Sequence, residues 1–125
     1  NFINMAEANL VSKKVRMGHR DIIKYQLVTY CFTNQIQLSS NELNCLTLLG
    51  AFGECELSEF CNSTVEEKIF KTSQTVRNFL TKACKLKLVK KKGTNKKKIF
   101  INPVLQVQTK GNIILDFKLF YVTKK

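Results

Sequence analysis

The sequence predicts an α+β domain in which a small helical core supports a β-hairpin and a second β-hairpin is added at the C-terminus. Two observations support this prediction. Four segments between residues 19 and 86 repeat apolar residues near helical spacing. Residues 88–101 instead place two short apolar runs on either side of Gly93 and Asn95, which are residue types that tolerate the positive φ angles of tight turns.

The first 35 residues are predicted to contain a basic segment and one helix. Residues 1–18 have no clean apolar period, so they form either a short helix over 5–15 or an arm. An arm would lie on a polyanion, pack on a second subunit or remain a partly ordered tail. A helix is predicted over 19–35. Its apolar side is expected to contain Ile22, Ile23, Leu27, Val28, Cys31, Phe32 and Ile36.

A capping box predicts the next helix. Ser39 and Glu42 have the spacing at which each side chain bonds to the backbone N–H of the other residue. A helix is therefore expected over 41–52. Gly50 and Gly53 are expected to mark its end, because glycine readily adopts the backbone conformation that ends a helix.

The segment that follows is predicted to be helical again. After a short extended piece, a helix begins at Leu57. Its connection to the next helix, residues 63–70, is longer than the about 3–4 residues of a tight turn between two helices. Val65, Ile69 and Phe70 predict an extra helical turn within this connection.

Residues 72–86 are predicted to form an amphipathic helix. Thr72 and Ser73 suit its start, since a side-chain hydroxyl accepts a hydrogen bond from the otherwise unpaired N–H groups there. Its apolar stripe consists of Val76, Leu80, Ala83, Cys84 and Leu86. Its other face carries side chains that donate hydrogen bonds to phosphates or base edges, namely Gln74, Thr75, Arg77, Asn78, Thr81, Lys82 and Lys85.

A β-hairpin with a basic tip is predicted next. Leu88 and Val89 open its first strand, and residues 99–101 form the second. The lysines that flank the turn are Lys90, Lys91, Lys92, Lys96, Lys97 and Lys98. Adjacent like charges repel one another, so this tip is expected to face an anionic partner.

Residues 104–125 are predicted to add the second β-hairpin. A turn is indicated at 109–112, and residues 113–122 then form a strand with apolar groups on both faces. Such a strand is either central in a sheet or covered by a partner. The segment 113–122 therefore either completes the domain core or forms a contact with a second copy of the chain or with other proteins of an assembly.

The distribution of charge indicates a polyanionic partner. The chain has 21 lysine and arginine residues against 9 acidic residues, which gives a net charge of +12. No acidic residue occurs between Lys68 and Leu115, whereas an acidic cluster precedes this segment and consists of Glu54, Glu56, Glu59, Glu66 and Glu67. One face or end is therefore expected to be strongly positive and another mildly negative. A strongly positive face is typical of proteins that bind nucleic acid, an anionic membrane or an acidic protein.

This order of elements resembles the winged helix-turn-helix domain over residues 38–103. The junction KACKLKLVKKK, which joins the amphipathic helix to the basic hairpin, is similar to the junction after the recognition helix of MarR-like regulators. The ending IFINP at 99–103 is similar to the closing strand of winged-helix replication initiators of plasmids and phages. The predicted organisation is therefore a basic arm over 1–18, a winged-helix domain over 19–103 and a C-terminal β extension over 104–125, of which the arm and the extension lie outside the resemblance.

The resemblance also implies a site for double-stranded DNA. A recognition helix lies in the major groove and contacts base edges through its first exposed residues. These would be Gln74, Thr75, Arg77 and Asn78, of which Gln and Asn suit adenine and Arg suits guanine. Side chains nearer the DNA backbone would be Thr81, Lys82 and Lys85. The hairpin lysines would contact phosphates, since an ammonium group is a point charge that carries no sequence information.

The sequence offers little for catalysis or metal binding. His19 is the only histidine, and no P-loop, dinucleotide-binding glycine motif or zinc-protease motif occurs, so neither enzyme activity nor a cofactor is predicted. The five cysteines include no Cys-x2–4-Cys pair, which favours buried reduced thiols over a zinc site. No apolar run reaches about 18 residues and no secretion signal is visible, so no membrane partner is expected.

Three functions remain open. The first is binding of double-stranded DNA by a transcription regulator or replication protein of phage or plasmid type, in the cytoplasm of a bacterial host. The second is a structural or packaged virion protein that uses the same fold for protein–protein contacts, with 113–122 as the contact. The third is binding of RNA or single strands, for which Phe79 and Phe120 are the candidate exposed aromatic side chains. The third is disfavoured because most aromatic residues fall on inward faces, and the first is the preferred function.

Overall fold

The computed structural model describes residues 5–7, 18–109 and 120–122, which belong to two compact units. The larger unit spans Met17–Gly111, and the smaller one combines the two ends of the chain, Asn1–Arg16 and Asn112–Lys125. The predicted DNA-binding helix and hairpin, residues 72–101, both lie within the larger unit.

In the smaller unit, strand β1 (Met5–Glu7) pairs antiparallel with strand β5 (Phe120–Val122). Residues 5–7 are therefore a strand and not the start of the helix considered over 5–15. The strand predicted over 113–122 is observed at its last three residues, and its other residues lie outside the described part of the chain. The predicted C-terminal hairpin is therefore wrong in its pairing, because Pro103–Leu105 form a 3-10 helix and β5 pairs with the N-terminal strand. This pairing is a non-local contact that no turn signal indicates.

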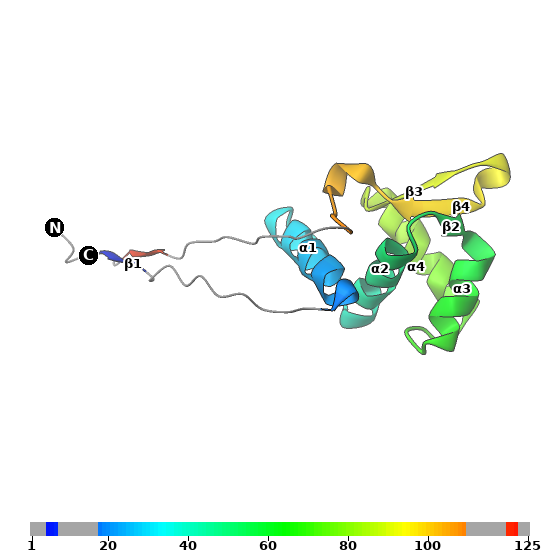
Figure 1. The fold of residues 1–125 in the computed structure, drawn as a ribbon, viewed down its shortest axis with the longest axis horizontal. Helices are drawn as coiled ribbons and strands as arrows, with labels where there is room; N and C mark the ends of the chain where they lie inside the picture. The colour runs from blue at the N-terminus through cyan, green and yellow to red at the C-terminus, as the bar shows by residue number, and fades with distance from the viewer. Residues whose placement is uncertain (1–4, 8–17, 110–119, 123–125) are drawn as a thin grey trace. The chain divides into compact units, whose positions relative to one another are not determined.

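The larger unit confirms the α+β class (Figure 1). Its described helices are α1 (His19–Thr33), α2 (Ser40–Phe52), α3 (Leu57–Glu66) and α4 (Ser73–Lys85). Its described strands are β2 (Cys55–Glu56), β3 (Val89–Lys92) and β4 (Lys98–Ile101). They form an antiparallel sheet in the order β2-β4-β3, and the sheet lies along one side of the helices.

The core lies between the helices and the sheet. Its largest fully buried side chains come from all four helices, the α4–β3 junction and β4, and they include Phe60, Ile23, Leu27, Leu46, Leu49, Leu80, Leu88 and Ile99. Helix α2 packs against both α1 and β4, and α4 packs against both α3 and β3. This packing fixes the direction in which α4 and the hairpin present their outer faces. No helix among the described residues is long and apolar enough to cross a membrane.

The predicted start of α2 is confirmed. The Ser39 hydroxyl accepts from the Glu42 backbone N–H at 3.2 Å, and the Glu42 carboxylate accepts from the Ser39 N–H at 2.8 Å. Gly53 ends the helix with a φ of 73°, as expected. Gly50, however, lies inside α2. A Cβ atom there would lie 2.8 Å from Ile23 Cγ2, so the glycine allows α1 to pack closely.

The apolar side predicted for α1 is too broad. Only Ile23, Leu27 and Cys31 are buried, whereas Val28 is 43% exposed and Phe32 is 83% exposed. The reason is that α2 is the main neighbour of α1, and one neighbour covers only a narrow stripe of a helix.

The extra helical turn predicted after the third helix is present, because α3 continues to Glu66. Lys68 then adopts a φ of 62°, which ends the helical path. Ile69 and Phe70 pack on the core without being helical. The connection to α4 is therefore ordered by side-chain packing.

Candidate nucleic-acid interface

Helix α4 is amphipathic in the way that the sequence predicts. Thr72 caps its start, with the hydroxyl accepting from the Thr75 N–H at 3.2 Å. Val76, Leu80 and Ala83 are fully buried. All seven predicted contact residues of the helix are exposed, namely Gln74, Thr75, Arg77, Asn78, Thr81, Lys82 and Lys85. The fold thus presents one polar helix face to solvent.

Two expectations for the same helix are wrong. Phe79 is not an exposed aromatic side chain, because it is 5% exposed and its ring centroid lies 6.0 Å from that of Phe70. Leu86 is exposed instead of buried, because it lies past the last helical turn, at the C-cap. The burial of Phe79 removes one of the two candidate stacking residues for single strands, and the Phe120 side chain lies outside the described residues.

Neighbouring side chains restrain several polar groups on α4. Gln74 Nε2 donates to Asn78 Oδ1 at 2.9 Å, and the Thr81 hydroxyl donates to the Arg77 carbonyl at 3.0 Å. The Gln74–Asn78 pair leaves one amide oxygen and one amide nitrogen to bond elsewhere. Together these two groups have the acceptor and donor character that the major-groove edge of adenine requires.

The predicted hairpin is confirmed, with Lys91 opposite Ile99 and Lys92 opposite Lys98. Gly93 and Asn95 adopt positive φ angles of 91° and 60°, as expected, and so does Lys96, at 53°. Ile99 is buried, so Lys91, its cross-strand neighbour, lies on the helix-facing side of the sheet. Lys91 is half-buried and the other five hairpin lysines are exposed.

Arg77 of α4 and Lys91 of β3 both act on one buried thiol. Burial raises the pKa of the Cys61 thiol, and the positive charges of Arg77 and Lys91 oppose that rise. Neither cation has an ion-pair partner among the described residues. We call the exposed and half-buried basic residues of α4 and of the hairpin the positive surface.

Two of the predicted contact lysines form ion pairs with acidic residues, and a third lies opposite an acidic residue in the sheet. Lys82 Nζ lies 3.0 Å from Glu42 Oε2, and Lys92 Nζ lies 2.9 Å from Glu54 Oε2. Lys98 lies directly opposite Glu56 across β4 and β2. The hairpin base therefore meets the acidic cluster, contrary to the expectation that the two are separate. The predicted cations without an ion pair or an opposite acid in the described residues are Arg77, Lys85, Lys90, Lys91, Lys96 and Lys97.

Asn102 positions the hairpin, a role that no local sequence pattern indicates. Its side-chain amide donates to the Lys87 carbonyl at 2.8 Å, its side-chain oxygen accepts from the Val104 N–H at 3.1 Å, and its N–H donates to the Leu88 carbonyl at 2.9 Å. The base of β4 is thereby tied to the α4–β3 junction. Lys87, which is exposed at that junction, is a further cation that the prediction omitted.

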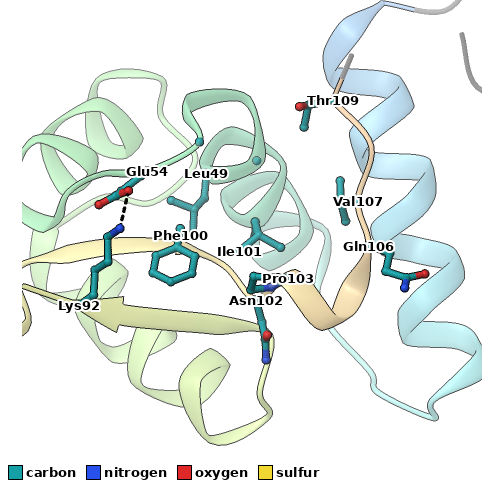
Figure 2. A pocket seen from close by; sticks show the side chains of 12 residues that line it. Leu49, Glu54, Lys92, Phe100, Ile101, Asn102, Pro103, Gln106, Val107 and Thr109 are labelled. Atoms are coloured by element: carbon teal, nitrogen blue, oxygen red, sulfur yellow. Dashed lines mark ion pairs between the residues drawn. The ribbon is translucent and has the colours of Figure 1, made fainter. Parts of the chain in front are cut away.

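A cavity of about 470 Å³ opens beside the hairpin base (Figure 2). Its walls include Leu49, Phe100, Ile101 and Val107, and the Lys92–Glu54 ion pair lies at its edge. None of its lining residues comes from α4. The cavity is therefore separate from the predicted base-contacting residues.

The cysteines are free thiols in the structure. Burial raises the pKa of Cys45 to about 12 and that of Cys55 to about 11, which keeps both protonated and weakly nucleophilic near neutral pH. Among the described residues, no group of three histidine, cysteine or acidic side chains is placed to hold a metal ion.

The contribution of the Glu42 carboxylate to the stability of the domain depends on pH. Burial alone would raise the pKa of this carboxyl group, but the Ser39 N–H and the Lys82 ammonium hold the pKa below its usual value. Because the folded pKa is the lower one, this stabilisation is complete above the unfolded value, about 4.3, and is lost as the pH falls through the folded value. We expect urea unfolding of Glu42→Gln to show a weaker loss of stability below about pH 4.3 than the wild type. Equal pH dependence in the two proteins would contradict this assignment.

No protein-family model, curated protein or solved structure matches this chain. The function is therefore inferred from the surface formed by α4 and the β3–β4 hairpin.

Proposed function

We propose that the chain is a winged helix-turn-helix protein that binds double-stranded DNA, with α4 in the major groove and the β3–β4 hairpin as the wing. The observation that carries this proposal is the direct succession of two features. An exposed polar helix face is followed at once by a hairpin with exposed lysines, and no acidic residue interrupts the segment. Such a surface suits a rigid, regularly charged polyanion.

The arrangement of the elements supports the winged-helix assignment. Helices α2, α3 and α4 precede the hairpin, and the short strand β2 between α2 and α3 pairs with β4 at the edge of the sheet. This order is compatible with a winged helix in which α3 supports the recognition helix. Helix α1 is an addition at the N-terminal side of this arrangement.

The side chains of α4 favour recognition of base edges over backbone contacts alone. Gln74 and Asn78 suit adenine, and Arg77, between them on the helix, suits guanine. A protein with these contacts would act as a transcription regulator or replication protein of the phage or plasmid type. The burial of Phe79 disfavours single strands, which normally stack on exposed aromatic side chains.

A salt titration of duplex binding tests the proposal. We expect log Kd to depend linearly on log salt, with an absolute slope of about 4 to 5 for about five phosphate contacts. Mobility-shift or anisotropy titrations with duplex, single-stranded and RNA competitors measure both the slope and the preference. Affinity for duplex that stays constant between low and moderate salt would exclude this function.

A second candidate is a structural or packaged virion protein, and one observation favours it. Tyr25, Val28 and Phe32 are 47%, 43% and 83% exposed, and their spacing places them on one face of α1. An exposed apolar stripe of this kind suits a protein–protein contact. A stable oligomer that forms without nucleic acid, and that is unchanged when the hairpin lysines are neutralised, would favour this function over DNA binding.

A further inference from the structure

Two carboxylates hold lysines of the positive surface. Glu42 pairs with Lys82 of α4, and Glu54 pairs with Lys92 of β3. Figure 2 shows the Lys92 side chain directed toward Glu54, and its Nζ also lies 5.6 Å from the centroid of the Phe100 ring. Lys82 and Lys92 are therefore already neutralised by ion pairs. Lys96 and Lys97 at the turn have no ion pair among the described residues.

The fold restrains the Glu42 carboxylate directly and places the Glu54 backbone at a fixed point of the chain. Glu42 Oε1 accepts the Ser39 N–H while Oε2 faces Lys82, so the capping box prevents the carboxylate from moving with the lysine. Glu54 lies between Gly53, which ends α2, and strand β2, which pairs with β4. A phosphate that binds Lys82 or Lys92 would therefore lie close to a negative charge.

We propose that Glu42 and Glu54 attenuate DNA binding, because each competes with a phosphate for the lysine that it holds. The inference rests on the proposed function, since it concerns the same surface. A duplex gains a contact to Lys82 or Lys92 only by breaking an ion pair and by approaching the carboxylate left behind. The wild-type protein therefore makes fewer effective phosphate contacts than its number of surface lysines suggests.

The variants Glu42→Gln and Glu54→Gln test this inference, and Glu67→Gln is the matched control. Glutamine keeps the size of the side chain, and at position 42 its amide oxygen still accepts the Ser39 N–H. Glu67 forms an ion pair of the same kind with Arg20, at 2.6 Å, and neither residue is a predicted DNA contact. All three variants change the net charge equally, so a difference between them reports the position of the carboxylate.

We expect Glu42→Gln and Glu54→Gln to bind a short duplex more tightly and to steepen the salt slope by about 0.9 each, the value for one added phosphate contact. The gain in affinity should then be about 3.5-fold larger at about 50 mM than at about 200 mM salt. Glu67→Gln should leave the slope unchanged. Equal slopes for all three variants would overturn the attenuation but leave DNA binding intact.

Elution from immobilised heparin separates failure of this inference from failure of the proposed function. If no protein binds duplex in a salt-dependent way, the proposed function fails. Elution of Glu42→Gln and Glu54→Gln at higher salt than Glu67→Gln would then show that the two carboxylates weaken polyanion binding in general, while the attenuation of DNA binding would fail together with the proposed function. Elution of all three at the same salt would overturn the attenuation.

Discussion

Replacing four hairpin lysines by glutamine is expected to weaken duplex binding on the order of 10³-fold at about 0.1 M salt. The four are Lys90, Lys91, Lys96 and Lys97. They form no ion pair within the described residues, so each is free to displace a counterion from the DNA backbone. Four such contacts contribute about 3.6 to the absolute salt slope, which leaves a slope of about 1 from an original value of 4 to 5.

Two double lysine variants distinguish direct contacts between the hairpin and phosphates from an effect of the protein's net charge. The double variant Lys96→Gln/Lys97→Gln should lower the absolute slope by about 1.8, half the effect of the fourfold variant. The control double variant, Lys24→Gln/Lys68→Gln, removes the same charge from α1 and from the end of α3. It should change the slope by much less. Equal loss in the two double variants would mean that the hairpin contributes only to the overall field of the protein.

The elements of this surface could be predicted because their signals are local. Turn residues determine the hairpin between 93 and 95, and a capping box of two side chains three positions apart determines the start of α2. Apolar spacing determines the buried stripe of α4. Each of these signals depends on residues within one or two turns of the chain. These elements can therefore be predicted without knowledge of contacts between distant parts of the chain.

The ion pairs that neutralise lysines of the positive surface could not be predicted, because they depend on contacts between residues far apart in the sequence. Glu42 and Lys82 are 40 positions apart, and nothing in either neighbourhood indicates that α2 and α4 bring them together. The exposure of Phe32 has the same origin. Apolar periodicity shows which side of a helix could be buried, but only the number of neighbouring elements decides how much of that side is covered.

The core that positions α4 and the hairpin is expected to depend strongly on Phe60. Its side chain is fully buried and is the largest such side chain in the described residues, and its ring meets Phe52 edge-on at a centroid distance of 6.1 Å. Phe60→Ala removes these contacts and leaves a cavity between α3 and its neighbours. The expected loss in the free energy of unfolding is about 3–5 kcal/mol. The total free energy of unfolding of a small domain is about 5–15 kcal/mol, so this variant would lose much of its stability.

Urea unfolding followed by circular dichroism measures this loss, and Phe32→Ala is the matched control. The chemical change is the same, but Phe32 is 83% exposed, so its effect should stay within about 0.5 kcal/mol. A lower midpoint for Phe60→Ala at an unchanged slope would place the loss in the folded core. Similar midpoints for the two variants would mean that α3 does not pack as described. The support that holds α4 and the hairpin in one orientation would then be absent.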